Sequence, residues 1–217
     1  MRDETVYSDD VQLKETVVLL HGLGANRLFV RPLANHFDDR GFRTEIWGYA
    51  SVRRGAEENG RRFRQFLEQL DEQPNCHRIH IVAHSMGSIV TRAALVDYRP
   101  RRLGRVVLLA PPNHGSPVAR RLASALAPIC PALRELSDSP DSFVNRLPDP
   151  KLEEIGIIAA AHDRVVPLQS THLSTETEHV VLPFGHGSLL FQWETAATIE
   201  CFLERGSFCQ PCLEFAR

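Results

Sequence analysis

A serine lies in a five-residue segment whose neighbours suit a sharp turn. Ser85 is the centre of Ala-His-Ser-Met-Gly, residues 83–87, which follow an apolar run and precede a helical pattern. Small residues two before and two after a serine let a strand-to-helix turn close, and the turn lifts the hydroxyl clear of its neighbours. Ala83 and Gly87 meet this need, although glycine is more usual at position 83. The pattern predicts a nucleophile that attacks an acyl carbon; the alternative is an ordinary serine in a small-residue turn.

Such a nucleophile needs a base and an acid that orients the base, and both have candidates downstream. Asp163 follows the apolar run 155–160, and His186 lies between glycines in Phe-Gly-His-Gly-Ser, residues 184–188. The chain order Ser85, Asp163, His186 is the order expected when a strand–turn–helix segment carries the serine. Asp138 and Asp141 are weaker substitutes for the acid, and a solvated turn aspartate is the plain alternative for Asp163.

An oxyanion that forms during acyl transfer needs backbone N–H donors. His-Gly-Leu-Gly, residues 21–24, ends the first apolar run, and its Leu23 N–H is one candidate donor. The N–H of Met86, at the start of the helix after Ser85, is the second. We therefore expect Leu23 and Met86 to form an oxyanion hole.

Three further histidines are candidates for the surroundings of the substrate cleft. His21 and His84 stand beside the glycine and the serine of the two motifs, where we expect hydrogen-bond partners of the site. His114 follows a strand end in Asn-His-Gly-Ser, residues 113–116, and we expect it to border the cleft.

Short β-branched runs alternate with longer helical patterns, which predicts a parallel sheet covered by helices. Residues 117–150 are the exception, because the prolines at 128, 131, 140, 148 and 150 interrupt an apolar stretch there; we expect a small helical insertion. Its Leu122, Leu126, Ile129 and Leu133 either cap the core or form a lid over an acyl pocket. The predicted strands are 16–20, 42–47, 78–83, 105–110, 155–160 and 179–182, and the predicted helices are 29–40, 57–70, 88–98 and 189–203.

The motifs together resemble the α/β-hydrolase superfamily, and specifically its compact lipase and esterase branch. The His-Gly-x-Gly loop, the 83–87 segment, Ala-Pro-Pro-Asn-His-Gly-Ser, Asp-x-x-Val-Pro and Gly-His-Gly match in order between residues 16 and about 203. The resemblance implies an α/β-hydrolase fold with a mostly parallel central sheet. It also implies Ser85 as nucleophile, His186 as general base and Asp163 as its orienter.

Composition restricts the remaining possibilities. The 217 residues fit one domain, 1–217, and the net charge of −2 gives no reason to expect nucleic acid as a partner. The N-terminus lacks a secretory pattern and no run suits a membrane span, so we expect a cytoplasmic protein. No metal-ligand cluster is evident and acyl transfer needs no cofactor, so we expect neither; the oligomeric state stays undetermined. Cys209 and Cys212 are interpreted as two free thiols in a C-terminal tail.

The function expected from these features is hydrolysis of carboxylic esters with hydrophobic acyl chains. The substrate would be a small-molecule or lipid ester, and transient contact with a lipid surface is left open. An acyltransferase or thioesterase would use the same three residues. A binding scaffold without catalysis is a further alternative, against which the complete set of residues argues.

Overall fold

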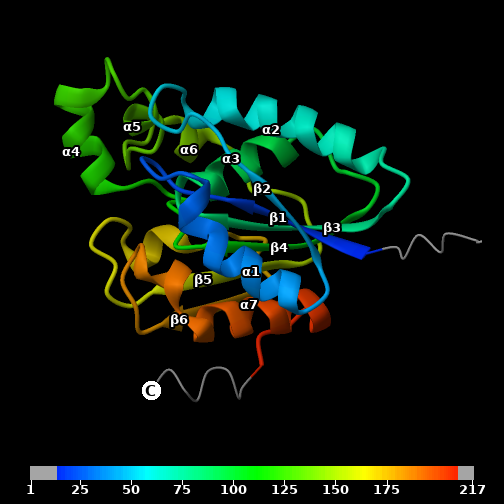
Figure 1. Ribbon diagram of the computed structural model, residues 1–217. Coiled ribbons are helices and arrows are strands. Elements are labelled where there is room, and N and C mark those ends of the chain that lie inside the picture. The colour runs from blue at the N-terminus through cyan, green and yellow to red at the C-terminus, as the bar shows by residue number, and fades with distance from the viewer. Residues whose placement is uncertain (1–13, 210–217) are drawn as a thin grey trace, which may run out of the picture.

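A six-stranded parallel sheet organises the chain (Figure 1). The computed structural model describes residues 14–209, and the spatial order of strands is β2-β1-β3-β4-β5-β6. Every neighbouring pair is parallel. The strands are β1 (Lys14–Leu20), β2 (Arg43–Trp47), β3 (Cys76–His84), β4 (Leu103–Leu109), β5 (Ile155–Ala160) and β6 (Glu178–Leu182).

Helices cover both faces of the sheet, and side chains alternate between them because successive residues of a strand point to opposite faces. Val18 and Leu20 pack toward α2 and α3, whereas Val17 and Leu19 pack toward α1 and α7. Figure 1 shows these helix pairs on opposite sides of the strands. The helices are α1 (Arg31–Asp39), α2 (Ala56–Asp71), α3 (Met86–Leu95), α4 (Pro117–Leu126), α5 (Ala132–Glu135), α6 (Phe143–Arg146) and α7 (Trp193–Arg205), with 3-10 turns at Arg27–Val30, Leu168–Thr171 and Ser188–Phe191.

The sequence predictions of a parallel sheet and its strands are confirmed, with differences at the ends of three helices. The helix predicted over 88–98 is α3, which begins at Met86 and ends at Leu95. The patterns over 29–40 and 189–203 each predict one continuous helix, but each begins with a separate 3-10 turn. Pro32 lies in the first turn of α1, where its missing N–H costs no helical hydrogen bond. Gly206, in a left-handed conformation, ends α7.

The insertion is helical, as predicted, and its apolar residues divide into two groups. Leu133 is buried and joins the core, so the core-capping interpretation holds for it. That interpretation is wrong for Leu122, Leu126 and Ile129, which are 44%, 40% and 68% exposed. Ala119 is the one buried residue of α4, so Leu122 and Leu126 of this helix face outward, and Ile129 follows the helix.

The cysteine prediction needs a correction. Cys209 is not a free thiol, since it forms a disulfide with Cys201 of α7. The intervening Phe208 packs on Phe202, and its N–H bonds the Glu178 carboxylate. The disulfide therefore fastens the end of the described chain to α7. Cys212 lies outside the described residues, and the cytoplasmic location stays a prediction.

Candidate functional site

The serine turn lies at the carboxyl end of β3, in the middle of the sheet. Ser85 has φ 54° and ψ −121°, a backbone conformation that non-glycine residues seldom adopt. Its N–H bonds the Leu109 carbonyl at 2.9 Å, and α3 begins at the next residue. A Cβ on Gly87 would lie 2.8 Å from the His21 carbonyl oxygen, so the turn can pack this closely because position 87 is glycine.

Ser85, His186 and Asp163 form one chain of hydrogen bonds. The Ser85 Oγ lies 2.9 Å from His186 Nε2, and His186 Nδ1 lies 2.6 Å from Asp163 Oδ2. Because a carboxylate only accepts, His186 Nδ1 carries the proton and its Nε2 accepts from the serine hydroxyl. The imidazole is therefore poised to take the Ser85 proton. The structure thus brings together three residues that are 78 and 23 positions apart in sequence.

Asp163 is fixed on its other side by the turn that follows β5. Its Oδ1 accepts the N–H groups of Val165 at 2.7 Å and Val166 at 2.8 Å. Burial acts to raise the pKa of the Asp163 carboxyl, but the hydrogen bond and charge of His186 and the two backbone donors outweigh it. The pKa therefore lies below its ordinary value, and Asp163 is ionised at neutral pH.

His84 lies beneath His186 and holds its backbone. The His84 Nε2–H donates to the His186 carbonyl at 2.9 Å, and the two rings are 4.9 Å apart. Its Nδ1 has no partner among the described residues and is closed in by Gly22, where a Cβ would come within 3.0 Å. Burial, with a smaller contribution from His186, lowers the pKa of His84 to about 3, so the ring is neutral.

The His21–Gly24 loop runs beside the serine turn. A Cβ on Gly22 would lie 3.1 Å from the Ser85 Cβ, which shows how closely the two segments approach. Within the described residues, the N–H groups of Leu23 and Met86 have no hydrogen-bond partner. Both donors are thus free to bind an oxygen, as an oxyanion hole requires. Their role stays a prediction.

Two residues that sequence patterns missed hold this loop in place. The Tyr49 hydroxyl donates to the His21 carbonyl at 2.6 Å, and its ring stacks on His21 at 4.4 Å. The Ser51 Oγ accepts the Gly24 N–H at 3.1 Å. Both residues follow β2, the strand next to β1, and therefore lie at the same edge of the sheet as the loop. That position was the one indication in the sequence that they could contact it.

The three histidines predicted near the cleft occupy different surroundings. His21 and His84 are buried, 1% and 6% exposed, and bond backbone carbonyls. These bonds fit their interpretation as hydrogen-bond partners of the site, and their place at the cleft stays a prediction. His114 is exposed, and its N–H donates to the Ser170 carbonyl. A place for His114 at the cleft stays a prediction.

The substitute acids lie elsewhere. Asp138 forms an ion pair with Arg120 of α4 at 2.9 Å, and Asp141 lines a pocket between the insertion and the start of α2. Neither hydrogen-bonds to His186, which is bonded to Asp163 instead.

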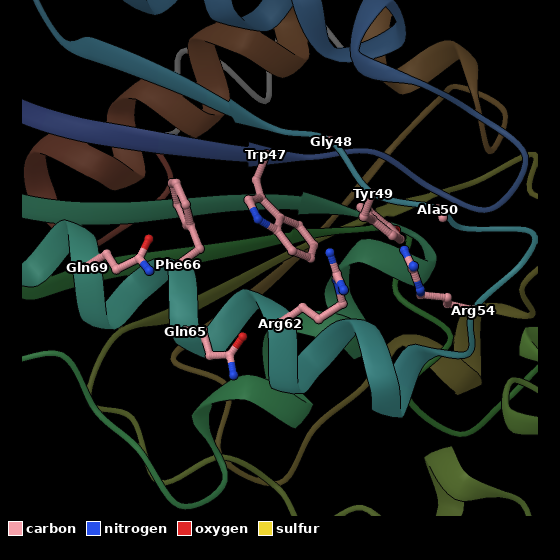
Figure 2. A pocket seen from close by; sticks show the side chains of 9 residues that line it. All are labelled: Trp47, Gly48, Tyr49, Ala50, Arg54, Arg62, Gln65, Phe66 and Gln69. Carbon is pink, nitrogen blue, oxygen red and sulfur yellow. The ribbon is translucent and has the colours of Figure 1, made fainter.

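A pocket of about 480 Å³ opens between the end of β2 and helix α2 (Figure 2). Trp47, Tyr49 and Phe66 supply its aromatic surface, and Figure 2 shows the Arg54 and Arg62 side chains extending toward these rings. Neither Ser85 nor any residue of the His21–Gly24 loop lines it, so this pocket is separate from the serine.

Among residues 14–209, no three His, Cys, Asp or Glu side chains gather in a way that could hold a metal ion. No helix in this part of the chain is both long enough and apolar enough to cross a membrane.

The parallel sheet, the strained serine between a strand and a helix, and the late histidine define an α/β-hydrolase architecture. A profile of the alpha/beta hydrolase family matches residues 17–201. The match spans most of the chain, so the chain belongs to the alpha/beta hydrolase family. A search of curated protein sequences found no match.

Solved structures with a similar fold include several lipases and esterases. The mature lipase BlEst2 of Bacillus licheniformis aligns with a TM-score of 0.70 and 16% identity, over 91% of this chain and 94% of the lipase. The phospholipase PlaB of Legionella pneumophila aligns with a TM-score of 0.68 and 17% identity, over 94% of this chain and 61% of PlaB. The Pyrococcus furiosus esterase Pf2001 aligns with a TM-score of 0.63 and 16% identity, over 90% of this chain and 84% of the esterase. At these identities the likeness shows a common fold.

Proposed function

We propose that this chain is a carboxylic ester hydrolase that acts on hydrophobic acyl chains. The observation that carries the proposal is the hydrogen-bond chain from Asp163 through His186 to Ser85, which ends on a serine held in a strained turn. The lipases and esterases among the similar structures favour an ester over other acyl bonds.

In the first half of the reaction, Ser85 Oγ attacks the acyl carbon while His186 Nε2 takes its proton. The carbonyl oxygen becomes an oxyanion, which the free N–H groups of Leu23 and Met86 would stabilise by two hydrogen bonds. The C–O bond to the alcohol then breaks, and His186 returns the proton to the departing alkoxide. The products of this half are a free alcohol and an acyl ester on Ser85.

In the second half, water takes the place of the alcohol. His186 removes a proton from water as the hydroxide attacks the acyl carbon, and the proton passes back to Ser85 Oγ when the ester breaks. A carboxylic acid leaves and the serine is regenerated. Asp163 stays ionised throughout, keeping the proton on Nδ1 and stabilising the imidazolium that forms.

The test replaces the nucleophile. Ser85→Ala should lower kcat for p-nitrophenyl esters by at least about 10⁴-fold while the fold is retained, because the acyl intermediate has no oxygen on which to form. Ser124→Ala, at an exposed serine of α4, is the matched control and should keep the wild-type rate. Wild-type turnover by Ser85→Ala would overturn the proposal.

Two further measurements define the substrate. A series of esters of increasing acyl length should show kcat/KM rising with chain length before it declines. Product analysis with added alcohols and with acyl thioesters separates a hydrolase from an acyltransferase or a thioesterase. A fluorophosphonate that labels wild type but not Ser85→Ala would exclude a scaffold without catalysis.

A further inference from the structure

Five segments form a closed rim around Ser85, at the carboxyl edge of the sheet. We define the rim as residues 21–31, 48–56, 110–136, 161–172 and 183–193. Each follows a different strand, and parallel strands bring these segments to one edge. Figure 1 shows them at the same end of the molecule.

Contacts join each segment of the rim to the next. Gly24 N–H bonds Ser51, and Glu135 bonds the N–H groups at the start of α2. On the other side, Ser116 Oγ donates to the Val165 carbonyl at 2.6 Å and His162 N–H donates to Phe184 at 2.9 Å. Phe191 completes the ring against Phe29, with centroids 6.3 Å apart.

The rim carries most of the large hydrophobic side chains that are exposed in residues 14–209. Of the twelve large hydrophobic side chains that are exposed in the described residues, ten belong to the rim. The insertion contributes Leu122, Leu126 and Ile129, and the two loops on the opposite side contribute Leu28, Phe29 and Phe191. Scattered single residues need no explanation, but this concentration around one site points to a partner with an apolar surface.

The same rim is strongly basic. Its segments contain eight arginines and two acidic residues. The whole chain has 25 basic and 27 acidic residues, so 17 basic and 25 acidic residues lie outside the rim. Both acids are engaged: Asp163 bonds His186, and Glu135 bonds the start of α2. Among the arginines, Arg54 and Arg120 form ion pairs; the other six form none with described residues.

We propose that the rim docks on the surface of an anionic phospholipid bilayer. Exposed leucine, isoleucine and phenylalanine enter the boundary of the acyl chains, while arginines bind lipid phosphates through bidentate hydrogen bonds. The charge complementarity favours this partner over a second copy of the chain, because two rims face to face would oppose sixteen arginines. The apolar side chains favour it over a soluble polyanion.

Docking in this orientation has a consequence for the site. Because the rim surrounds Ser85, the bound face would present the serine to the lipid phase. The inference concerns binding, which needs no catalysis. It is therefore tested with Ser85→Ala as background, so that a failure of the proposed hydrolase activity and a failure of docking are distinguished.

The first experiment is co-sedimentation of Ser85→Ala protein with vesicles at low ionic strength. We expect binding to vesicles of 30% phosphatidylglycerol in phosphatidylcholine to be at least about tenfold tighter than to phosphatidylcholine alone, and to weaken with added salt. Failure to bind the anionic vesicles would overturn the proposal.

Two sets of variants separate the contributions. Leu122→Ser with Leu126→Ser and Ile129→Ser should weaken binding about tenfold or more, while Val96→Ser with Val181→Ser, exposed outside the rim, should have no effect. Arg31→Gln with Arg121→Gln should reduce the dependence on phosphatidylglycerol, while Arg61→Gln with Arg205→Gln, on exposed helix positions outside the rim, should not. Equal losses in the control variants would contradict docking through the rim.

The remaining arms address other partners, with circular dichroism checking that each variant is folded. Heparin binding that matches vesicle binding and ignores the three apolar substitutions would assign the rim to a polyanion instead. A wild-type dimer that becomes a monomer in the apolar variant would assign it to a second copy. Either result would overturn the proposal.

Discussion

The hydrogen-bonded site at Ser85 and the helical insertion 117–150 lie at the same edge of the sheet, but they are held in opposite ways. Around Ser85, hydrogen bonds fix the polar side chains: two backbone N–H groups hold Asp163, and Asp163 and Ser85 hold the His186 ring. The His186 and Asp163 side chains are 17% and 3% exposed. Helix α4 instead buries only Ala119 and turns its leucines outward. Proton transfer requires fixed distances between atoms, whereas contact with a surface requires exposed side chains.

In the hydrogen-bonded site, a substitution at Asp163 tests this comparison most severely. In Asp163→Asn the amide oxygen can still accept the N–H groups of Val165 and Val166, but its NH₂ faces His186 Nδ1. The imidazole proton then moves to Nε2, which can no longer accept from Ser85. We expect kcat for a soluble ester to fall by about 10⁴-fold, as measured by steady-state kinetics.

A thermal unfolding curve is the control for this variant. It should show a folded protein, since the turn at 163–166 is kept. A similar loss of rate together with a collapsed fold would mean that Asp163 acts in stability alone.

The second test is the pH dependence of stability, which should reflect the buried ring of His84 under His186. His84 has a pKa of about 3 when folded and about 6.5 when unfolded, so the unfolded state binds the extra proton between these values. The stability that depends on neutral His84 is thus complete above pH 6.5 and is lost as pH falls toward 3. The loss is at most about 1.4 kcal/mol per pH unit. Urea unfolding of wild type and His84→Gln should show a shallower pH dependence in the variant.

Glutamine suits this comparison because its amide can still donate to the His186 carbonyl, yet it does not titrate. The other histidines and carboxylates are the same in both proteins, so their contributions cancel. Parallel curves for the two proteins would show that His84 does not titrate in this way.

Helix α4, which buries little of its surface, should tolerate substitution of its exposed side chains. Leu126→Ser removes a side chain that is 40% exposed, so we expect the free energy of unfolding to change by less than about 0.5 kcal/mol. Activity on a soluble short-chain ester should change by less than about twofold, because Leu126 is not part of the hydrogen-bond chain from Asp163 to Ser85. Chemical denaturation and kinetics check both values. A large loss of rate would mean that α4 closes over the site as a lid.

Much of the fold and of the candidate site was predictable because the signals are local. The β-branched runs place the strands, and the small residues around Ser85 suit one kind of turn. Chain order then selects Asp163 and His186, since the carboxyl ends of parallel strands share one edge. Tyr49 and Ser51 were missed because their partners, His21 and Gly24, are more than 20 positions away.

The sequence by itself determined that Ser85 stands between a strand and a helix and that Asp163 and His186 follow later strands, because period and turn chemistry are properties of short segments. Only the tertiary structure decided that Leu133 is buried while Leu126 is exposed, since both belong to the same apolar pattern. It also paired Cys201 with Cys209 and placed eight arginines around one site. Burial and charge clustering depend on which segments pack together, and that is decided by the whole chain.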